Sequence, residues 1–171
     1  SVHAERVIVA LPPALAGRIR YSPALPGRRD QLTQQVPMGA VIKIQVRYEE
    51  PFWRRHGLSG FVVSLDDPIG VMFDNSPQDL NSGVLLGFFE GEHATEAALM
   101  DADERCALAL GCFAKYFGER ALYPVECVEQ DWAAEEFSRG CYGGRMGTGV
   151  WTRYAQTLRE PMRTSSLDLL T

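Results

Sequence analysis

The sequence predicts an α+β fold: a mixed, largely antiparallel sheet of about five to seven strands, with helices packed on one of its faces. Residues 41–48 alternate between apolar and polar side chains, as a half-buried strand does. Apolar runs over 60–65, 70–73 and 83–89 follow at the spacing of an antiparallel meander, and a capped amphipathic helix covers 102–117. Because strands and helices alternate without a regular β-α-β rhythm, helices layered on one sheet face are favoured.

The first third of the chain is expected to hold two strands and one helix. Residues 6–11 are an apolar run that stops at two prolines, which is typical of a strand buried on both faces. Residues 26–35 predict a polar helix that begins at a proline, and residues 36–39 predict a turn. In the strand over 41–48, Lys43 is on the wetter face, opposite the face shared by Ile42, Ile44, Val46 and Tyr48.

The helix over 102–117 has the clearest local signals of the second half. Asp101 is a good N-cap with Glu104 three residues later, and Gly118 supplies a C-terminal stop. Its apolar side chains recur at helical spacing at Cys106, Ala109, Leu110, Phe113 and Phe117. A last strand over 125–130, a glycine-rich stretch over 140–149 and a helix over 150–158 complete the prediction.

Length and charge limit the class of protein. A chain of 171 residues is expected to form one compact unit. The net charge of −5 supplies no basic field for phosphates, so we expect neither nucleic acid nor an anionic membrane as partner, and a neutral or cationic small molecule fits better. Because no apolar run approaches the about 20 residues that span a bilayer and no signal peptide is visible, a cytoplasmic location is expected.

The cysteines, histidines and acidic turns predict no metal site. The four cysteines include no Cys-x-x-Cys pair and the three histidines are far apart, so we expect neither a structural zinc site nor a disulfide framework. Asp66, Asp67 and Asp74 lack the ligand spacing of a calcium loop and are read as turn residues. Residues 147–149 are only weakly similar to a nucleotide-binding loop, since such a loop follows a strand and no strand is predicted before them.

Two residues, Cys141 and Lys43, each have a plain interpretation and a functional one. A lone cysteine is usually a small buried hydrophobe, and a lysine on a polar strand face is usually solvated. However, the glycines at 140, 143 and 144 let the backbone beside Cys141 approach a flat ligand or another element closely, and Tyr142 adds an aromatic face. From the residues alone both interpretations stay open.

Several ordered segments resemble the flavin monoamine oxidases. The segments are Val7-Ile8-Val9-Ala10-Leu11-Pro12-Pro13, Tyr21-Ser22-Pro23-Ala24-Leu25-Pro26, Val41-Ile42-Lys43, Glu50-Pro51-Phe52-Trp53, Asp131-Trp132 and Gly140-Cys141-Tyr142. The first two are shared with related flavoprotein oxidases, whereas Glu50 to Trp53 and Gly140 to Tyr142 are closer to the amine oxidases themselves. The resemblance implies oxidation of a small-molecule amine to an imine by FAD, with O₂ as the final acceptor.

The resemblance also implies roles for four residues. Cys141 matches a cysteine that forms a thioether to the 8α-methyl group of FAD in some members. Tyr142 matches one wall of an aromatic cage around the substrate amine. Lys43 matches a lysine that holds a water against the flavin N5, and Trp132 matches a tryptophan of the flavin-facing region, where a packing role is an equal alternative.

The resemblance to this family also implies domain boundaries. Residues 1–161 are expected to form the substrate-binding domain, with residues 1–13 resembling a strand of the FAD domain and 162–171 a tail that does not match. The family's glycine-rich FAD loop and its Gly-Thr-Glu segment have no counterpart in this sequence, so the isolated chain is expected to hold flavin poorly, to be inactive, and to self-associate through the edge of the strand over 7–11. The alternative function is a free-standing, non-catalytic binding or interaction module derived from this domain.

Overall fold

The computed structural model describes residues 4–78 and 81–162, and the chain forms two compact units. One unit contains residues 40–132, and the other combines the residues up to 39 with those from 133 onward. Length had predicted one compact unit, but the buried apolar side chains gather into two separate clusters, one in each unit. Of the predicted tail over 162–171, all but Met162 lies outside the described residues.

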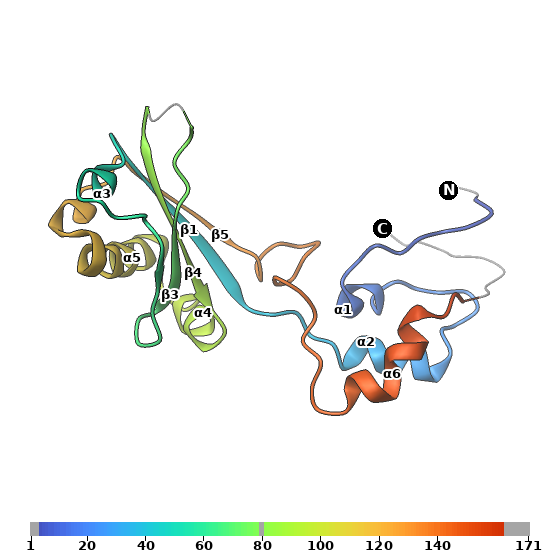
Figure 1. The fold of residues 1–171 in the computed structure, drawn as a ribbon. Helices are drawn as coiled ribbons and strands as arrows, with labels where there is room; N and C mark the ends of the chain where they lie inside the picture. The colour runs from blue at the N-terminus through green and yellow to red at the C-terminus, as the bar shows by residue number, and fades with distance from the viewer. Residues whose placement is uncertain (1–3, 79–80, 163–171) are drawn as a thin grey trace. The chain divides into compact units, whose positions relative to one another are not determined.

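The larger unit contains a five-stranded antiparallel sheet in the order β2-β3-β4-β1-β5 (Figure 1). The strands are β1 (Val41–Tyr48), β2 (Val62–Val63), β3 (Ile69–Asp74), β4 (Gly83–Glu90) and β5 (Glu126–Asp131). All five strands predicted within this unit are confirmed. Every described strand pair is antiparallel, so the mixed character allowed for in the prediction is not found among these strands.

Helices cover one face of this sheet, as predicted (Figure 1). They are α3 (Phe52–Arg55), α4 (Glu92–Ala97), α5 (Ala102–Phe117) and the 3₁₀ turn η1 (Glu119–Leu122). Asp101 and Glu104 form the predicted capping box at the start of α5, and Gly118 ends the helix. The core between helices and sheet includes the fully buried side chains of Trp53, Phe89 and Phe113. The short helices α3 and α4 were missed because four to six residues carry too little periodicity to be recognised.

A disulfide links α5 to β5, contrary to the sequence-based expectation. Cys106 and Cys127 are bonded, with their Cα atoms 6.4 Å apart. The two cysteines are 21 residues apart and carry no recognisable spacing. Only the packing of α5 against the sheet brings them within bonding distance, so the sequence held no signal for this pair.

The smaller unit is built on three helices, α1 (Pro13–Ala16), α2 (Gly27–Gln34) and α6 (Val150–Arg159) (Figure 1). Helices α2 and α6 confirm the two helices predicted there. Their shared core consists of Leu32, Val36, Val150 and Tyr154. Arg28 of α2 donates to the backbone carbonyl of Arg153 within α6, and Arg29 donates to the carbonyls of Leu158 and Glu160 at the end of that helix.

Two predictions for the smaller unit were wrong. Residues 6–11 form no strand, and Ile8 is 91% exposed; the run has the apolar residues of a buried strand but no neighbour to pair with among the described residues. Residues 36–39 form no turn either, since Met38 is extended and pairs with Gly144. No described helix is long and apolar enough to cross a membrane.

Two partly buried carboxylates, Asp74 and Asp67, join helices to the sheet region of the larger unit. Asp74, at the end of β3, accepts hydrogen bonds from Trp53 Nε1 at 2.8 Å and from Arg54 Nε at 2.6 Å. Burial raises the pKa of Asp74, but the hydrogen bonds from Arg54, Ser76 and Trp53 outweigh it and hold that pKa at about 2. Hydrogen bonds from Tyr116, Ser64 and Lys115 likewise lower the pKa of Asp67 to about 2.

These lowered pKa values predict acid sensitivity. A carboxylate with a depressed folded-state pKa stabilises the fold above its ordinary pKa, and this contribution disappears as the pH falls from about 4 to about 2. Asp74→Asn should therefore lower the free energy of unfolding at pH 7 by about 2 kcal/mol and flatten its decline below pH 4. Urea denaturation at several pH values measures both effects. Asp66→Asn, at an exposed position beside Asp67, is the control; equal profiles for the two variants would contradict the prediction.

Candidate functional site

Lys43 projects from the face of the sheet opposite the helices. Alternate residues of β1, from Ile42 to Tyr48, are buried beneath the helices, so the residues between them point to the other face. Lys43 is half-buried there. We call this surface of the sheet the open face. The prediction that Lys43 lies on the wetter side of its strand is confirmed.

The strand register determines the neighbours of Lys43 on the open face. Lys43 stands opposite Phe88 of β4 and opposite Gln130 of β5, and Phe88 in turn stands opposite Val71 of β3. Directly opposite side chains on one face are about 5 Å apart at Cβ and contact one another. The lysine therefore lies between an apolar side of the face and a polar one.

Aromatic rings extend the apolar side. The ring of Phe73 lies 6.3 Å from Phe88 and 5.2 Å from Phe61, measured between centroids. Phe61 and Phe73 are 54% and 37% exposed, so their faces are open to a binding partner. Leu86 lies between these rings and Gln45, because it pairs with Phe73 on one side and Gln45 on the other. The sequence did not identify these side chains as neighbours of Lys43. Alternation shows which face of a strand a residue is on, but it does not show which residues of the neighbouring strands lie opposite.

Lys43 shares the open face with other charged residues. Arg47 and Glu126 face each other across β1 and β5, with Nε and Oε2 3.1 Å apart. The residues directly opposite Lys43, Phe88 and Gln130, are neutral. Glu90, which pairs with Val41 and lies on the open face by strand alternation, adds an exposed carboxylate to this half-aromatic surface.

Trp132 follows the last residue of β5. Its backbone N–H donates to the carbonyl of Val41 at 3.3 Å, which continues the pairing of β5 with β1 by one residue. By strand alternation Trp132 belongs to the same face as Gln130 and hence Lys43. The side chain is half-buried.

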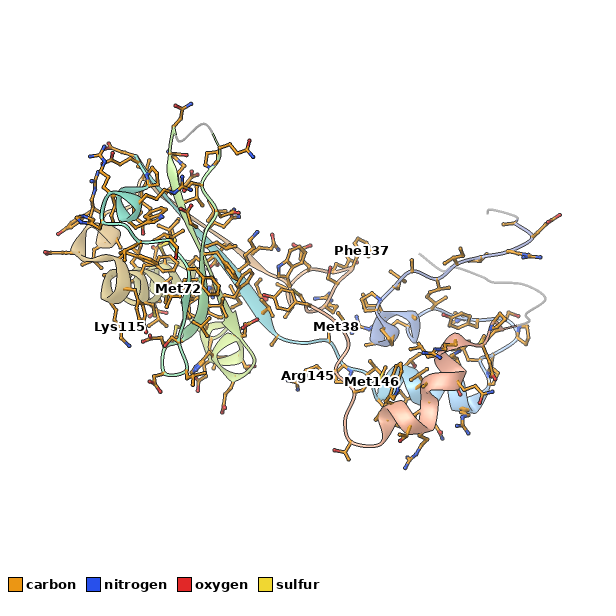
Figure 2. All side chains as sticks on the ribbon, viewed as in Figure 1. Met38, Met72, Lys115, Phe137, Arg145 and Met146 are labelled. Atoms are coloured by element: carbon orange, nitrogen blue, oxygen red, sulfur yellow. A yellow bond between two sulfur atoms is a disulfide. The ribbon has the colours of Figure 1, made fainter. Side chains whose placement is uncertain are left out.

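Cys141 and Tyr142 lie in the smaller unit, on a segment that pairs with residues 37–39. The amide of Cys141 donates to the Gly39 carbonyl at 2.9 Å, and the amide of Gly39 donates to the Gly143 carbonyl at 3.1 Å. The Arg145 amide continues this ladder to the Pro37 carbonyl at 2.6 Å. Figure 2 shows Arg145 and Met146 alongside Met38. Backbone hydrogen bonds therefore hold this segment against residues 37–39.

The glycines of this segment allow two backbones to approach each other. A Cβ at Gly39 would collide with the carbonyl oxygen of Cys141, and one at Gly140 would collide with the carbonyl oxygen of Gly39. A Cβ at Gly144 would meet the side chain of Val36. By contrast, a Cβ at Gly143 would meet nothing within 4 Å. Three of these glycines are explained by contact with another element of the protein, one of the two explanations left open by the sequence.

Cys141 is half-buried, whereas Cys112 is buried. Cys141 forms no disulfide and is half-buried, and the ring of Tyr142 is 66% exposed; the peptide bond between them is cis. Cys112 is buried in the main core, where burial raises the pKa of its thiol. The description of an inert, buried cysteine therefore fits Cys112 and does not fit Cys141.

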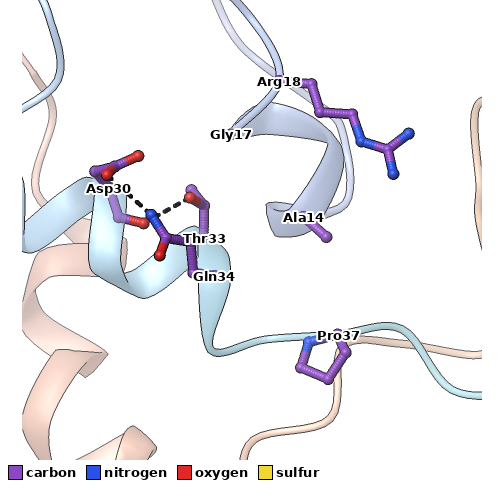
Figure 3. A pocket seen from close by; sticks show the side chains of 7 residues that line it. All are labelled: Ala14, Gly17, Arg18, Asp30, Thr33, Gln34 and Pro37. Carbon is purple, nitrogen blue, oxygen red and sulfur yellow. Dashed lines mark hydrogen bonds between the residues drawn. The ribbon is translucent and has the colours of Figure 1, made fainter.

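Two pockets in the smaller unit contain none of the predicted site residues. A pocket of about 230 Å³ is lined by Asp30, Thr33, Gln34 and their neighbours (Figure 3). Gln34 donates to Asp30 at 2.9 Å and Thr33 to the Asp30 carbonyl at 2.7 Å, so these groups are engaged with one another. A second pocket, of about 480 Å³, is bordered by Arg28 and Arg29, whose guanidinium groups already bind α6.

Metal chemistry has no visible basis in the part of the chain that the structure describes, because no three His, Cys, Asp or Glu side chains gather there as a metal site would require. The predicted site residues divide between the units, with Lys43 and Trp132 in the larger, and Cys141 and Tyr142 in the smaller.

The larger unit thus carries a lysine on a half-aromatic open face, and the smaller unit carries a half-buried cysteine beside an exposed tyrosine. The profile of the family "Flavin containing amine oxidoreductase" matches residues 1–165, and the chain belongs to this family.

Similar proteins agree with this assignment. The chain is 42% identical over 156 residues to "Probable flavin-containing monoamine oxidase A" of Dictyostelium discoideum, covering 91% of this chain and 34% of that protein. It is 42% identical over 155 residues to "L-amino acid dehydrogenase" of Synechocystis sp., covering 91% and 33%. The solved structure of wild-type putrescine oxidase bound to putrescine superimposes with a TM-score of 0.88 at 39% identity, covering 92% and 35%. The chain therefore spans about a third of the length of its curated relatives.

The glycine contacts around Cys141 give a direct test. Gly39→Ala places a methyl group against the Cys141 carbonyl and should reduce the free energy of unfolding by roughly 2 kcal/mol, while amide exchange at Cys141 becomes faster. Denaturant titration and hydrogen–deuterium exchange measure the two effects. Gly143→Ala, in the same segment but with open space around its Cβ, should leave both nearly unchanged. If the amide of Cys141 exchanges as slowly in Gly39→Ala as in the unmodified protein, the close approach of the two backbones is not required.

Proposed function

We propose that this chain is the substrate-binding portion of an FAD-dependent amine oxidase, an oxidoreductase that acts on CH–NH₂ or CH–NH groups with O₂ as acceptor. The observation that carries the proposal is the placement of Lys43 on the open face between Phe88 and Gln130, in a chain that belongs to the flavin-dependent family. A small-molecule amine is the proposed substrate. The relatives' names support this class, since they include a monoamine oxidase and a putrescine oxidase.

The residues of the smaller unit fit a covalently held flavin. A thioether to the 8α-methyl group needs a thiol outside any disulfide and outside the core, and Cys141 satisfies both conditions. The ladder to residues 37–39 holds the backbone that carries this thiol. When bound, FAD would supply the acceptor for the two electrons that leave the amine.

The residues of the chain would orient the amine and control protons. Tyr142 is proposed as one wall of the cage around the substrate nitrogen, because its exposed ring offers a π face without a charge. An amine in such surroundings stays closer to its neutral form, which has the lone pair that oxidation requires.

Lys43 is proposed to hold a water molecule beside the reacting centre. Its ammonium group has three hydrogen-bond donors. The residues directly opposite it, Phe88 and Gln130, carry no charge that would pair with it, so a donor can bind a water molecule. Trp132, on the same face, is proposed to border the flavin or to pack beside it.

The alternative of a free-standing, non-catalytic module is not favoured. The family match over residues 1–165 and the oxidase names of the relatives support the enzyme instead. The domain boundary at residue 161, the inactivity of the isolated chain, its self-association through residues 7–11 and the cytoplasmic location stay predictions. So does the absence of nucleic-acid and membrane partners.

Replacement of Lys43 tests its proposed role. In the intact protein, with every domain that its gene encodes, Lys43→Met should slow flavin reduction or reoxidation by about a hundredfold while the fold is retained. Stopped-flow absorbance of the flavin separates these two half-reactions. The control is Arg47→Met, which removes a cation from the same face of the same strand. Kinetics equal to those of Arg47→Met would remove the water-holding role.

Replacement of Cys141 tests the flavin linkage. Denatured intact protein should retain its flavin, with a flavin-sized mass increment on the peptide that contains Cys141, because a thioether survives unfolding. Cys141→Ser should release all flavin on denaturation, whereas Cys112→Ser, at a buried cysteine, should release none. Mass spectrometry of the peptides provides the readout. Complete release from the unmodified protein would exclude the covalent link.

A further inference from the structure

The disulfide between Cys106 and Cys127 lies at the boundary between α5 and the edge of the sheet. Cys106 is in the second turn of α5, and Cys127 is the second residue of β5, the last strand in the sheet order. Both residues are half-buried and only pack against the margin of the core. Small oxidants and reductants can therefore approach this pair, whereas the thiol of Cys112 is enclosed.

An ion pair beside the disulfide joins the same two elements. Arg105 Nε donates to Glu129 Oε2 at 2.7 Å, and a second donor of Arg105 binds the other carboxylate oxygen. Arg105 also donates to the backbone carbonyls of Ala97 and Met100, which anchors it at the end of α4. Since Arg105 precedes Cys106 and Glu129 shares a strand face with Cys127, this ion pair keeps the two sulfur atoms near each other whether or not they are bonded.

The crosslinked strand lies next to the strand of the proposed site. In the described part of the sheet, β5 pairs with β1 alone, and this pairing places Gln130 opposite Lys43. The amide of Trp132 completes the pairing at the Val41 carbonyl. An edge strand has one hydrogen-bonded neighbour and opens more readily than a central strand. Any tether that holds β5 against α5 therefore also holds the neighbours of Lys43 in place.

We propose that Cys106 and Cys127 form a reversible redox crosslink that is closed by hydrogen peroxide and that sets how firmly β5 is held beside Lys43. One thiolate attacks the peroxide, the O–O bond breaks, and a sulfenic acid and water result; the second thiolate displaces the hydroxyl as a second water and forms the S–S bond. In balance, two thiols lose two protons and two electrons, and one peroxide becomes two waters. A dithiol reductant reverses the reaction by thiol–disulfide exchange and is itself oxidised.

The link to the enzyme's own chemistry rests on the proposed function. An amine oxidase that passes electrons to O₂ releases hydrogen peroxide, so the oxidant would be its own product.

The first experiment follows the bond itself. The intact protein is equilibrated natively in glutathione buffers of graded ratio, and differential alkylation with peptide mass spectrometry gives the oxidised fraction of each cysteine. We expect Cys106 and Cys127 to change reversibly between the bonded and the reduced form within this range of buffers. One equivalent of added hydrogen peroxide should form the bond again. A pair that stays bonded in every buffer, or that never bonds, overturns the proposal. Because peroxide is added and no amine is present, the result does not depend on oxidase activity.

The second experiment follows the strand. In the reduced protein and in Cys127→Ser, exchange of the amide hydrogens over 126–131 should rise several-fold, and the melting temperature should fall by roughly 5 °C or more. The control, Cys112→Ser, removes a thiol of the same helix without touching the crosslink, and its exchange over 126–131 should follow the redox state as in the unmodified protein. Exchange over 126–131 that is equal in the oxidised and reduced proteins would show that the bond does not hold β5.

Discussion

Every second side chain of β1 is buried against α5 and its neighbours, and this burial determines where Lys43 lies. Ile44 and Val46 have no exposed surface, so a shift of the strand by one residue would bring Lys43 into the core and both apolar side chains out of it. The free energy of burying an unpaired ammonium group makes that alternative inaccessible. The position of the proposed water-holding residue is thus secured by the hydrophobic effect acting on residues that have no part in the chemistry.

The smaller unit relies on a different constraint. The backbone of residues 141–145 lies so close to that of residues 37–39 that no side chain fits between them at Gly39 or Gly140. Hydrogen bonds between main-chain groups then hold Cys141 whatever its own side chain does. The segment held in this way carries a half-buried cysteine and an exposed aromatic ring.

Most of the sheet could be predicted, because alternation over 41–48 and apolar runs between proline and aspartate turns are local signals. The same reasoning failed for residues 6–11, where an apolar run has no pairing strand among the described residues and remains exposed. It also failed for Cys106 and Cys127, since a disulfide depends on a distance in space that two unremarkable positions in a helix and a strand do not reveal. Family resemblance identified Lys43 and Cys141, but the aromatic neighbours of Lys43 needed the strand register.

The amino-acid sequence by itself determined the fold class, the family and which residue types are available for chemistry, because periodicity, capping residues and ordered motifs are written along the chain. Only the tertiary structure decided which residues lie next to Lys43 and Cys141. Phe88 and Gln130 flank Lys43 because β4 and β5 pair with β1 in one register, and Gly39 meets Cys141 because two segments about a hundred residues apart form one ladder. Such pairings depend on the burial and hydrogen bonding of whole elements, and no local pattern contains that information.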